Sequence, residues 1–181
     1  YGGKLDNKKV NVISDGINLY YKADMAGDEP YWLAVNLNMC AVLTCSNRYK
    51  ACQHAIKNLG VTTIILDDGF QYLRLKPHIN IVLVDSTAPF GNGHVLPRGI
   101  LREPIKNIRR ADYIFLTKSD GSHKLKHLRS FIRRYNKRAE IIECCHKPQY
   151  IQKLFADEQL TLDKLKGVKA AALSAIACPQ S

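Results

Sequence analysis

The sequence predicts an α/β fold in which helices cover both faces of a mostly parallel sheet. Short apolar runs recur along the chain, and several are separated by stretches with helical periodicity. Alternation of strand and helix is typical of parallel sheets, because a crossover helix links parallel neighbours. The chain has 181 residues, of which 46% are hydrophobic, enough for one domain with its own core. We therefore expect residues 1–181 to form a single α/β domain.

The expected strands are apolar runs at residues 10–13, 41–44, 62–66, 79–84, 113–116, 139–142 and 168–173. Between them, residues 48–59 place Ala51, Ala55 and Leu59 on one helical face and end at Gly60, a typical helix stop. Residues 123–138 also have apolar positions at helical spacing, which predicts a second, amphipathic helix.

The charge is strongly basic and unevenly distributed. The formal net charge is +11, which favours anionic partners such as nucleotides or an anionic membrane surface. Residues 123–138 contain many Lys and Arg residues and no acid. This helix is either a solvated helix packed on the sheet or a face for membrane or phosphate. The apolar runs are far shorter than the roughly 18 residues of a membrane span.

The six cysteines include no C-x-x-C pair and no metal-ligand spacing with histidine. Cys144 and Cys145 are adjacent, which suits neither a simple disulfide nor a standard zinc site. We expect reduced thiols in a cytosolic compartment.

Two acidic pairs are the main candidates for chemistry. Asp67 and Asp68 follow the apolar run 62–66, where carboxylates can hold Mg²⁺ beside a nucleotide, although Asp-Gly is also common in plain turns. Asp28 and Glu29 precede Pro30 at an expected helix start. There they either interact with the helix dipole or act as general base and metal ligand.

Residues 85–104 form a loop rich in Gly and Pro, and such loops in α/β folds often carry function. Arg98, Arg102 and Glu103 lie in or just after it, and a guanidinium there can bind phosphate in bidentate fashion. Thr117-Lys118-Ser119-Asp120 follows another strand and is weakly similar to the base-reading loops of nucleotide enzymes.

Several motifs occur in a specific order: Tyr1-Gly2-Gly3-Lys4, Gly27-Asp28-Glu29-Pro30, Leu66-Asp67-Asp68-Gly69-Phe70-Gln71, Ile81-Val82-Leu83-Val84-Asp85, Phe90-Gly91-Asn92-Gly93, Leu96-Pro97-Arg98-Gly99, Leu101-Arg102-Glu103-Pro104, and Arg110-Ala111-Asp112 leading to Thr117-Lys118. This set closely resembles the tetraacyldisaccharide 4′-kinases, the lipid A 4′-kinases of Gram-negative-type bacteria, over the whole chain. The resemblance implies a P-loop NTPase fold.

The resemblance also implies a reaction. Members of the family transfer the γ-phosphate of ATP, with Mg²⁺, to the 4′-hydroxyl of a tetraacyldisaccharide 1-phosphate, the lipid A disaccharide precursor. They act at the cytosolic face of the inner membrane, which makes its anionic surface a second partner, and no nucleic acid is expected. The implied catalytic residues are Asp28 (the base), Asp67 and Arg102. The implied cofactor-binding residues are Asp68, Glu29, Gln71 and Glu103, of which Asp68 and Glu29 would bind the metal.

The chain departs from the family pattern in three ways. Nothing in it matches the Walker A pattern G-x-x-x-x-G-K-[ST], which in the family precedes the Tyr1 segment. The family's later histidine, a partner of the catalytic Asp, would lie beyond Ser181. We therefore expect roughly the middle half of the enzyme, incomplete at both ends and inactive alone. Tyr72 stands where many members carry His. Two alternatives stay open, a P-loop GTPase or ATPase of another class and a basic anion-binding module.

Overall fold

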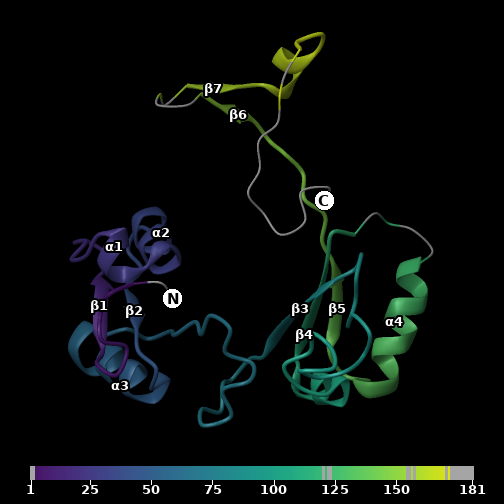
Figure 1. The fold of residues 1–181 in the computed structure, drawn as a ribbon, viewed down its shortest axis with the longest axis horizontal. Coiled ribbons are helices and arrows are strands. Elements are labelled where there is room, and N and C mark those ends of the chain that lie inside the picture. The colour runs from purple at the N-terminus through teal and green to yellow at the C-terminus, as the bar shows by residue number, and fades with distance from the viewer. Residues whose placement is uncertain are drawn as a thin grey trace. The chain divides into compact units, whose positions relative to one another are not determined.

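The structure is a computed structural model that describes residues 3–119, 121, 124–153, 156, 158–169 and 171. The chain divides into two compact units, Tyr1–Pro77 and His78–Ser181, here called unit 1 and unit 2 (Figure 1). The prediction of one domain over residues 1–181 stays a prediction. Among the described residues, no helix has the length and apolarity that a membrane crossing requires.

Unit 1 combines a small antiparallel sheet with three helices. Strand β1 (Asn11–Ser14) pairs with β2 (Val42–Thr44), and the helices are α1 (Ala23–Ala26), α2 (Asp28–Asn36) and α3 (Arg48–Leu59). Ile13 on β1 is fully buried, and Ala26 and Ala55 are buried on α1 and α3. The core of unit 1 therefore lies between the sheet and its helices.

Helix α3 has the bounds that the sequence predicted. The side chain of Asn47 accepts a hydrogen bond from the backbone N–H of Lys50 and caps the first turn. Gly60 ends the helix at a φ of 63°, in the left-handed region that glycine adopts without steric cost. Local sequence signals fix both ends of this helix.

The predicted strand at residues 62–66 was wrong. This segment belongs to none of the strands, and the side chains of Ile64 and Ile65 are 38% and 89% exposed. An apolar run becomes a strand only where neighbouring strands satisfy its backbone N–H and C=O groups. In unit 1, β1 and β2 pair with each other, and the parallel strands are in unit 2.

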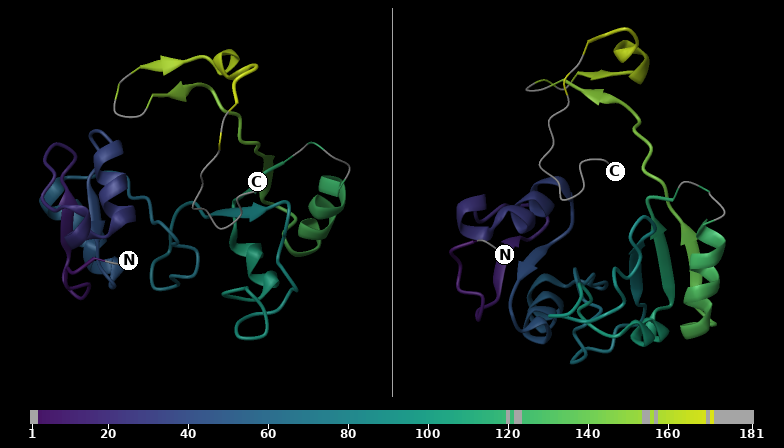
Figure 2. Two further views of the ribbon diagram at one scale, coloured as in Figure 1. Left: turned by 45° about the horizontal axis from the view of Figure 1, so that its top comes forward. Right: turned by 45° about the vertical axis from the view of Figure 1, so that its right-hand side comes forward.

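Unit 2 contains the predicted parallel sheet, with β3 (Ile81–Asp85), β4 (Tyr113–Thr117) and β5 (Glu140–Glu143) in the order β3-β4-β5. Helix α4 (Lys124–Tyr135) lies beside this sheet in both views of Figure 2. Ile114 and Leu116 of β4 and Ile132 of α4 are fully buried, which places the core between the helix and the sheet. The fold is therefore mixed α/β, although the expected single sheet is divided among separate sheets.

The remaining elements of unit 2 are short. The 3-10 helix η1 (Ile105–Arg110) precedes β4, and a small antiparallel pair, β6 (Ile151–Gln152) and β7 (Gln159–Leu160), is followed by η2 (Leu162–Leu165). The sequence did not predict β6 and β7. Half of the predicted strand at 168–173, residues 170, 172 and 173, lies outside the described residues, and the described residues 168, 169 and 171 belong to no strand.

Candidate functional site

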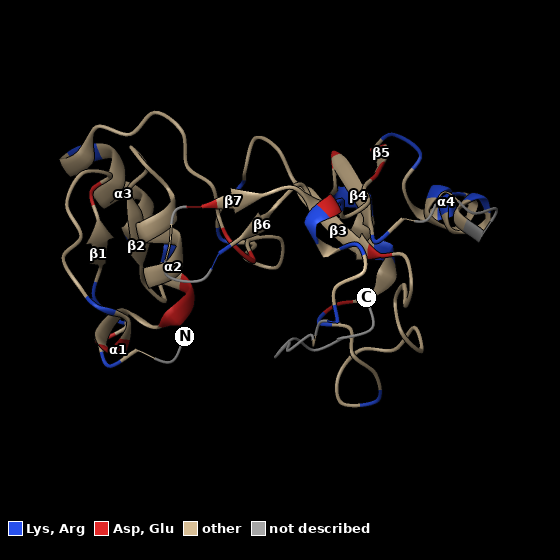
Figure 3. Ribbon diagram, turned by 90° about the horizontal axis from the view of Figure 1, so that it is seen from above, with Lys and Arg blue, Asp and Glu red and all other residues tan. Residues whose placement is uncertain are grey.

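Asp28 and Glu29 occupy the first turn of α2, and both are exposed to solvent. The N-cap of α2 is Gly27, whose φ of 91° allows the chain to turn sharply between α1 and α2. Asp28 is therefore not the capping residue, and its carboxylate gains only from the helix dipole. Figure 3 shows the acidic start of α2 in red. This geometry leaves Asp28 accessible to a substrate hydroxyl.

Gly3, near the start of the chain, packs against this junction. A Cβ on Gly3 would lie 2.3 Å from the carbonyl oxygen of Met25 and 2.6 Å from the backbone nitrogen of Gly27. No larger residue fits there. The backbone N–H of Leu5 donates to the same Met25 oxygen at 3.2 Å. The close approach places exposed Lys4 in a segment that packs against the start of α2.

Asp67 and Asp68 lie in a turn that Arg48 holds to α3. The Nη2 atom of Arg48 donates to the backbone oxygen of Asp67 at 3.1 Å and to that of Asp68 at 3.5 Å. Both aspartates are exposed, and Asp68 has a left-handed φ of 48°. Gly69 is required because a Cβ there would lie 2.6 Å from the Cβ of Leu66. The turn therefore presents two carboxylates on a fixed backbone.

Tyr72 completes this arrangement. The guanidinium of Arg48 lies over its ring, with Cζ 5.3 Å from the ring centroid, a cation–π contact. The backbone N–H of Tyr72 donates to the oxygen of Gly69 at 2.9 Å. Gln71, between them, is exposed. Sequence reasoning missed Arg48, because no local pattern links it to residues about twenty positions later.

The carboxylates fit Mg²⁺ by chemistry but do not form a complete site. Carboxylate oxygens are the ligands that Mg²⁺ prefers, and Asp68 and Glu29 both supply them in unit 1. Among the described residues, no three His, Cys, Asp or Glu side chains are gathered as a metal site. Mg²⁺ commonly binds through one or two carboxylates and completes its shell with water and substrate phosphates. The residues present fit that mode.

In unit 2, Glu103 is engaged by its neighbours. Arg110 Nη2 lies 2.9 Å from both carboxylate oxygens, and Asn107 Nδ2 donates at 2.8 Å. The Glu103 side chain is only 19% exposed. These contacts fix the end of the Gly- and Pro-rich loop against η1, next to exposed Arg102. In this arrangement Glu103 positions the backbone that carries Arg102.

The loop before Arg102 is ordered by its own polar groups. Asn92 Nδ2 donates to the backbone oxygen of Arg98 at 2.8 Å, and the backbone N–H of Leu101 donates to the oxygen of His94 at 3.2 Å. A Cβ on Gly99 would lie 2.1 Å from Asn92 Oδ1, so only glycine fits. These contacts fix part of the backbone of the loop that the sequence predicted at residues 85–104.

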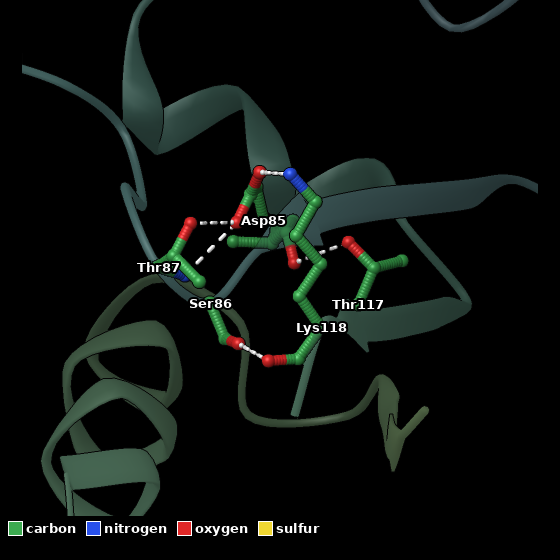
Figure 4. A network of polar contacts seen from close by, with 6 residues as sticks. Asp85, Ser86, Thr87, Thr117 and Lys118 are labelled. Carbon is green, nitrogen blue, oxygen red and sulfur yellow. Dashed lines mark hydrogen bonds and ion pairs between the residues drawn. The ribbon is translucent and has the colours of Figure 1, made fainter. Parts of the chain in front are cut away.

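A polar cluster at the carboxyl ends of β3 and β4 was not predicted as a unit (Figure 4). Asp85 accepts hydrogen bonds from the hydroxyl of Thr87 at 2.6 Å and from its N–H at 2.9 Å, and pairs with Lys118 Nζ at 3.0 Å. The Thr87 hydroxyl, the Thr87 N–H and Lys118 lower the pKa of Asp85 to about 2. Ser86 donates to the backbone oxygen of Lys118 at 2.8 Å.

This cluster accounts for part of the Thr117-Lys118-Ser119-Asp120 motif. Lys118 has a left-handed φ of 54° and turns its side chain to Asp85. Asp120 lies outside the described residues. Ligands of open α/β sheets bind at the carboxyl ends of parallel strands, which is where this cluster lies. The signal in the sequence was an Asp and a Lys ending neighbouring strands. The described cysteines, Cys40, Cys45, Cys52, Cys144 and Cys145, are free.

Comparison with known proteins gives one consistent result. The family model described as "Tetraacyldisaccharide-1-P 4'-kinase" matches residues 1–181. A tetraacyldisaccharide 4'-kinase from Halothermothrix orenii is 34% identical over 100% of this chain and 50% of its own length. One from Anaeromyxobacter dehalogenans (strain 2CP-C) is 39% identical over 94% of this chain and 45% of its own.

A solved structure agrees with these sequences. It is the crystal structure of the "apo" form of LpxK from Aquifex aeolicus in complex with ATP, at a TM-score of 0.64 and 30% identity. The match covers 92% of this chain and 49% of that one. The chain thus spans about half the length of the relatives it matches.

Proposed function

Because this chain belongs to the tetraacyldisaccharide 4'-kinase family, we propose that it serves the transfer of the ATP γ-phosphate to the 4′-hydroxyl of a tetraacyldisaccharide 1-phosphate in lipid A biosynthesis. The observation that carries the proposal is the family match over residues 1–181, which includes both exposed acidic pairs. The LpxK structure in complex with ATP supports ATP as the phosphate donor.

The proposed roles follow from where each side chain lies. Asp28, at the open start of α2, takes the proton from the sugar hydroxyl as general base. Asp67, on the turn that Arg48 fixes, serves the metal and the phosphates at the reacting centre. Mg²⁺, when bound, neutralises phosphate charge and orients the transferred group. Asp68 and Glu29 would hold it, with Gln71 on the nucleotide side.

Unit 2 supplies the second part of the proposed machinery. Arg102 stabilises the negative charge of the transferred phosphate, and a planar guanidinium suits phosphate oxygens. Glu103 is proposed as a nucleotide-site residue, held in place by Arg110 and Asn107.

The lipid substrate, the membrane surface and the cellular location are part of the same proposal. The substrate is a lipid, and the exposed basic side chains of α4, whose Lys and Arg positions are blue in Figure 3, suit an anionic inner-membrane surface at its cytosolic face.

A direct assay on the complete protein tests the function. Radiolabelled ATP and GTP are offered with tetraacyldisaccharide 1-phosphate, and with the same disaccharide after removal of its acyl chains. We expect ATP-dependent, Mg²⁺-dependent labelling of the lipid. Nucleotide hydrolysis with no labelled lipid, or a preference for GTP, would instead identify a P-loop enzyme of another class.

A further inference from the structure

Two of the most exposed large apolar side chains of unit 1 belong to segments that a backbone hydrogen bond joins. Ile17 is 90% exposed and Met39 is 93% exposed. The backbone N–H of Met39 donates to the oxygen of Gly16 at 3.1 Å, which joins the loop after β1 to the turn after α2. Single exposed apolar side chains are normal, but nearly full exposure of two on joined segments points to a contact surface.

The loop that carries Ile17 is fixed by its own hydrogen bonds. Asp15 Oδ1 accepts from the N–H groups of Ile17 at 2.9 Å and Asn18 at 2.7 Å. Asp15 Oδ2 accepts from Asn18 Nδ2 at 3.1 Å and from the hydroxyl of Tyr20 at 2.5 Å. A loop held in this way presents Ile17 to solvent without reorganising on contact.

The neighbouring turn is held just as closely. Gly16 has a φ of 97°, and a Cβ on it would lie 3.0 Å from the backbone of Met39. Met39 itself has a φ of 59°, a backbone conformation that residues other than glycine rarely adopt. An aliphatic residue is therefore kept in a strained conformation with its side chain in solvent.

Helix α2 connects this surface to the proposed base. Residues Asp28, Trp32 and Val35 are spaced as i, i+4 and i+7, which places them on one helical face. Trp32 is 64% and Val35 51% exposed. Met39 follows the end of α2 by three residues, and its hydrogen bond to Gly16 joins the loop in which Leu19 and Tyr20 are also exposed.

We propose that this apolar patch, made of Ile17, Leu19, Tyr20, Trp32, Val35 and Met39, docks into the interface of a lipid bilayer and holds Asp28 at headgroup level. The inference rests on the proposed function, because it takes the substrate to be a membrane lipid. Tyr and Trp are the residues enriched at membrane interfaces, whereas Ile and Met suit the acyl region. Exposed Lys22, two residues after Tyr20, suits the phosphates of lipid headgroups.

The dimensions agree with this placement. A helix rises about 1.5 Å per residue, so the length of α2 separates Asp28 from Asn36 by about 12 Å. The headgroup layer of one leaflet is about 5–8 Å thick. The apolar end can therefore reach acyl chains while the acid stays among sugars and phosphates.

The single tryptophan of the chain makes the test direct. In the 181-residue chain, the pair Trp32→Phe and Met39→Trp moves the fluorophore to the tip of the patch. The probe is a vesicle of phosphatidylcholine and phosphatidylglycerol with brominated acyl chains. We expect a blue shift and quenching that persist in high salt. Adding Ile17→Asp should lower partitioning about 10-fold, since it removes one buried apolar side chain.

Leu73→Asp is the matched control, because Leu73 is 72% exposed in the same unit and lies outside the patch. It should leave partitioning unchanged. The proposal is overturned if acyl bromines do not quench the tryptophan, if binding vanishes in high salt, or if Ile17→Asp and Leu73→Asp behave alike. Quenching by brominated substrate micelles but not by vesicles would assign the patch to substrate acyl chains and also overturn it.

This readout requires no phosphate transfer. Vesicle docking without kinase activity in the complete protein would leave the patch standing and reject the proposed function. Kinase activity without quenching would do the reverse.

Discussion

Asp28 is the residue on which the proposed reaction most depends. In the complete protein, Asp28→Asn keeps the size of the side chain but cannot take a proton from the sugar hydroxyl. General-base assistance contributes about 100-fold to 10,000-fold, so we expect turnover to fall by that range while ATP affinity changes little. Steady-state kinetics at saturating lipid measure the effect.

The variant Asp68→Asn distinguishes the role of a metal ligand from that of the general base. Removing a charge from the metal site should weaken Mg²⁺-dependent nucleotide binding as well as turnover.

Because Asp28 is not the N-cap of α2, its amide variant should unfold at nearly the same temperature as the parent. A folded Asp28→Asn enzyme with near-normal turnover would rule out the base.

Asp85 should make unit 2 sensitive to acid. Its pKa is lowered to about 2 by the Thr87 hydroxyl and N–H and by Lys118, below the usual value of about 3.9 for an aspartate. A lowered folded pKa contributes stability at pH values above the unfolded pKa, and this contribution is lost as pH falls from about 4 to about 2. At neutral pH it is fully present.

The comparison variant is Asp85→Asn, which cannot ionise. Its thermal midpoint should lie below the parent's at neutral pH, and the difference should shrink as the pH approaches 2. Equal differences at both pH values would show that the carboxylate charge plays no part.

At the scale of elements, buried Asn136 holds three segments of unit 2 together. Its Nδ2 donates to the backbone oxygens of Ile108 at 2.9 Å and Ala111 at 2.8 Å. Its Oδ1 accepts from the N–H groups of Arg138 at 3.0 Å and Ala139 at 2.8 Å. One amide therefore links η1, the start of β4 and the chain entering β5.

Asn136→Ala should destabilise unit 2 by about 3 kcal/mol, because it leaves several buried backbone groups without partners. Asn136→Asp keeps the two acceptor contacts and loses the two donor contacts, so it separates the halves of the network. Urea unfolding followed by far-UV circular dichroism measures both. A loss below about 0.5 kcal/mol for the Ala variant would show that water replaces the amide.

Helix α4 should bind anionic lipid through its outer charges. Arg133 donates to the backbone oxygen of Ala139 at 2.6 Å, and Arg129 pairs with Glu143 at 3.0 Å, so both serve the fold. Arg134 on α4 and Lys137, just after its end, are exposed. Reversing these two to Glu should weaken sedimentation with phosphatidylglycerol vesicles and flatten its salt dependence. Reversing exposed Lys57 and Lys50 on α3 is the control, and an equal effect there would reduce α4 to a solvated face.

Elements with complete local signals were predictable from the sequence. Asn47 and Gly60 mark both ends of α3, and the apolar spacing of α4 matches its buried Leu125, Leu128 and Ile132. Strands β3, β4 and β5 were predicted within about two residues. The run 62–66 failed because a strand depends on partners that are remote in sequence, which apolarity alone does not supply.

The same difference between local signals and remote contacts applies to the candidate site. The acidic pairs could be found in the sequence because each stands in a local motif, after an apolar run or before a helix start. The contacts of Arg48 with Asp67 and Tyr72, and of Lys118 with Asp85, join residues far apart along the chain. Only the fold brings such residues together. The assigned roles of Asp28, Glu29, Asp67, Asp68, Gln71, Arg102 and Glu103 stay predictions.

For the whole molecule, residues with proposed roles occur in both units, with Asp28, Glu29, Asp67, Asp68 and Gln71 in unit 1 and Arg102 and Glu103 in unit 2. No G-x-x-x-x-G-K-[ST] sequence occurs in the 181 residues. Phosphoryl transfer depends on positioning the nucleotide phosphates, and backbone N–H groups and a lysine of such a loop normally do this. The 181-residue chain alone should therefore transfer no measurable phosphate to tetraacyldisaccharide 1-phosphate. The assay compares it with the complete gene product at equal concentration, after circular dichroism has shown that the chain is folded. Labelled lipid from the folded chain alone would contradict this prediction and would mean that other groups position the phosphates. The exposed lysines of unit 1 would then be the first residues to substitute.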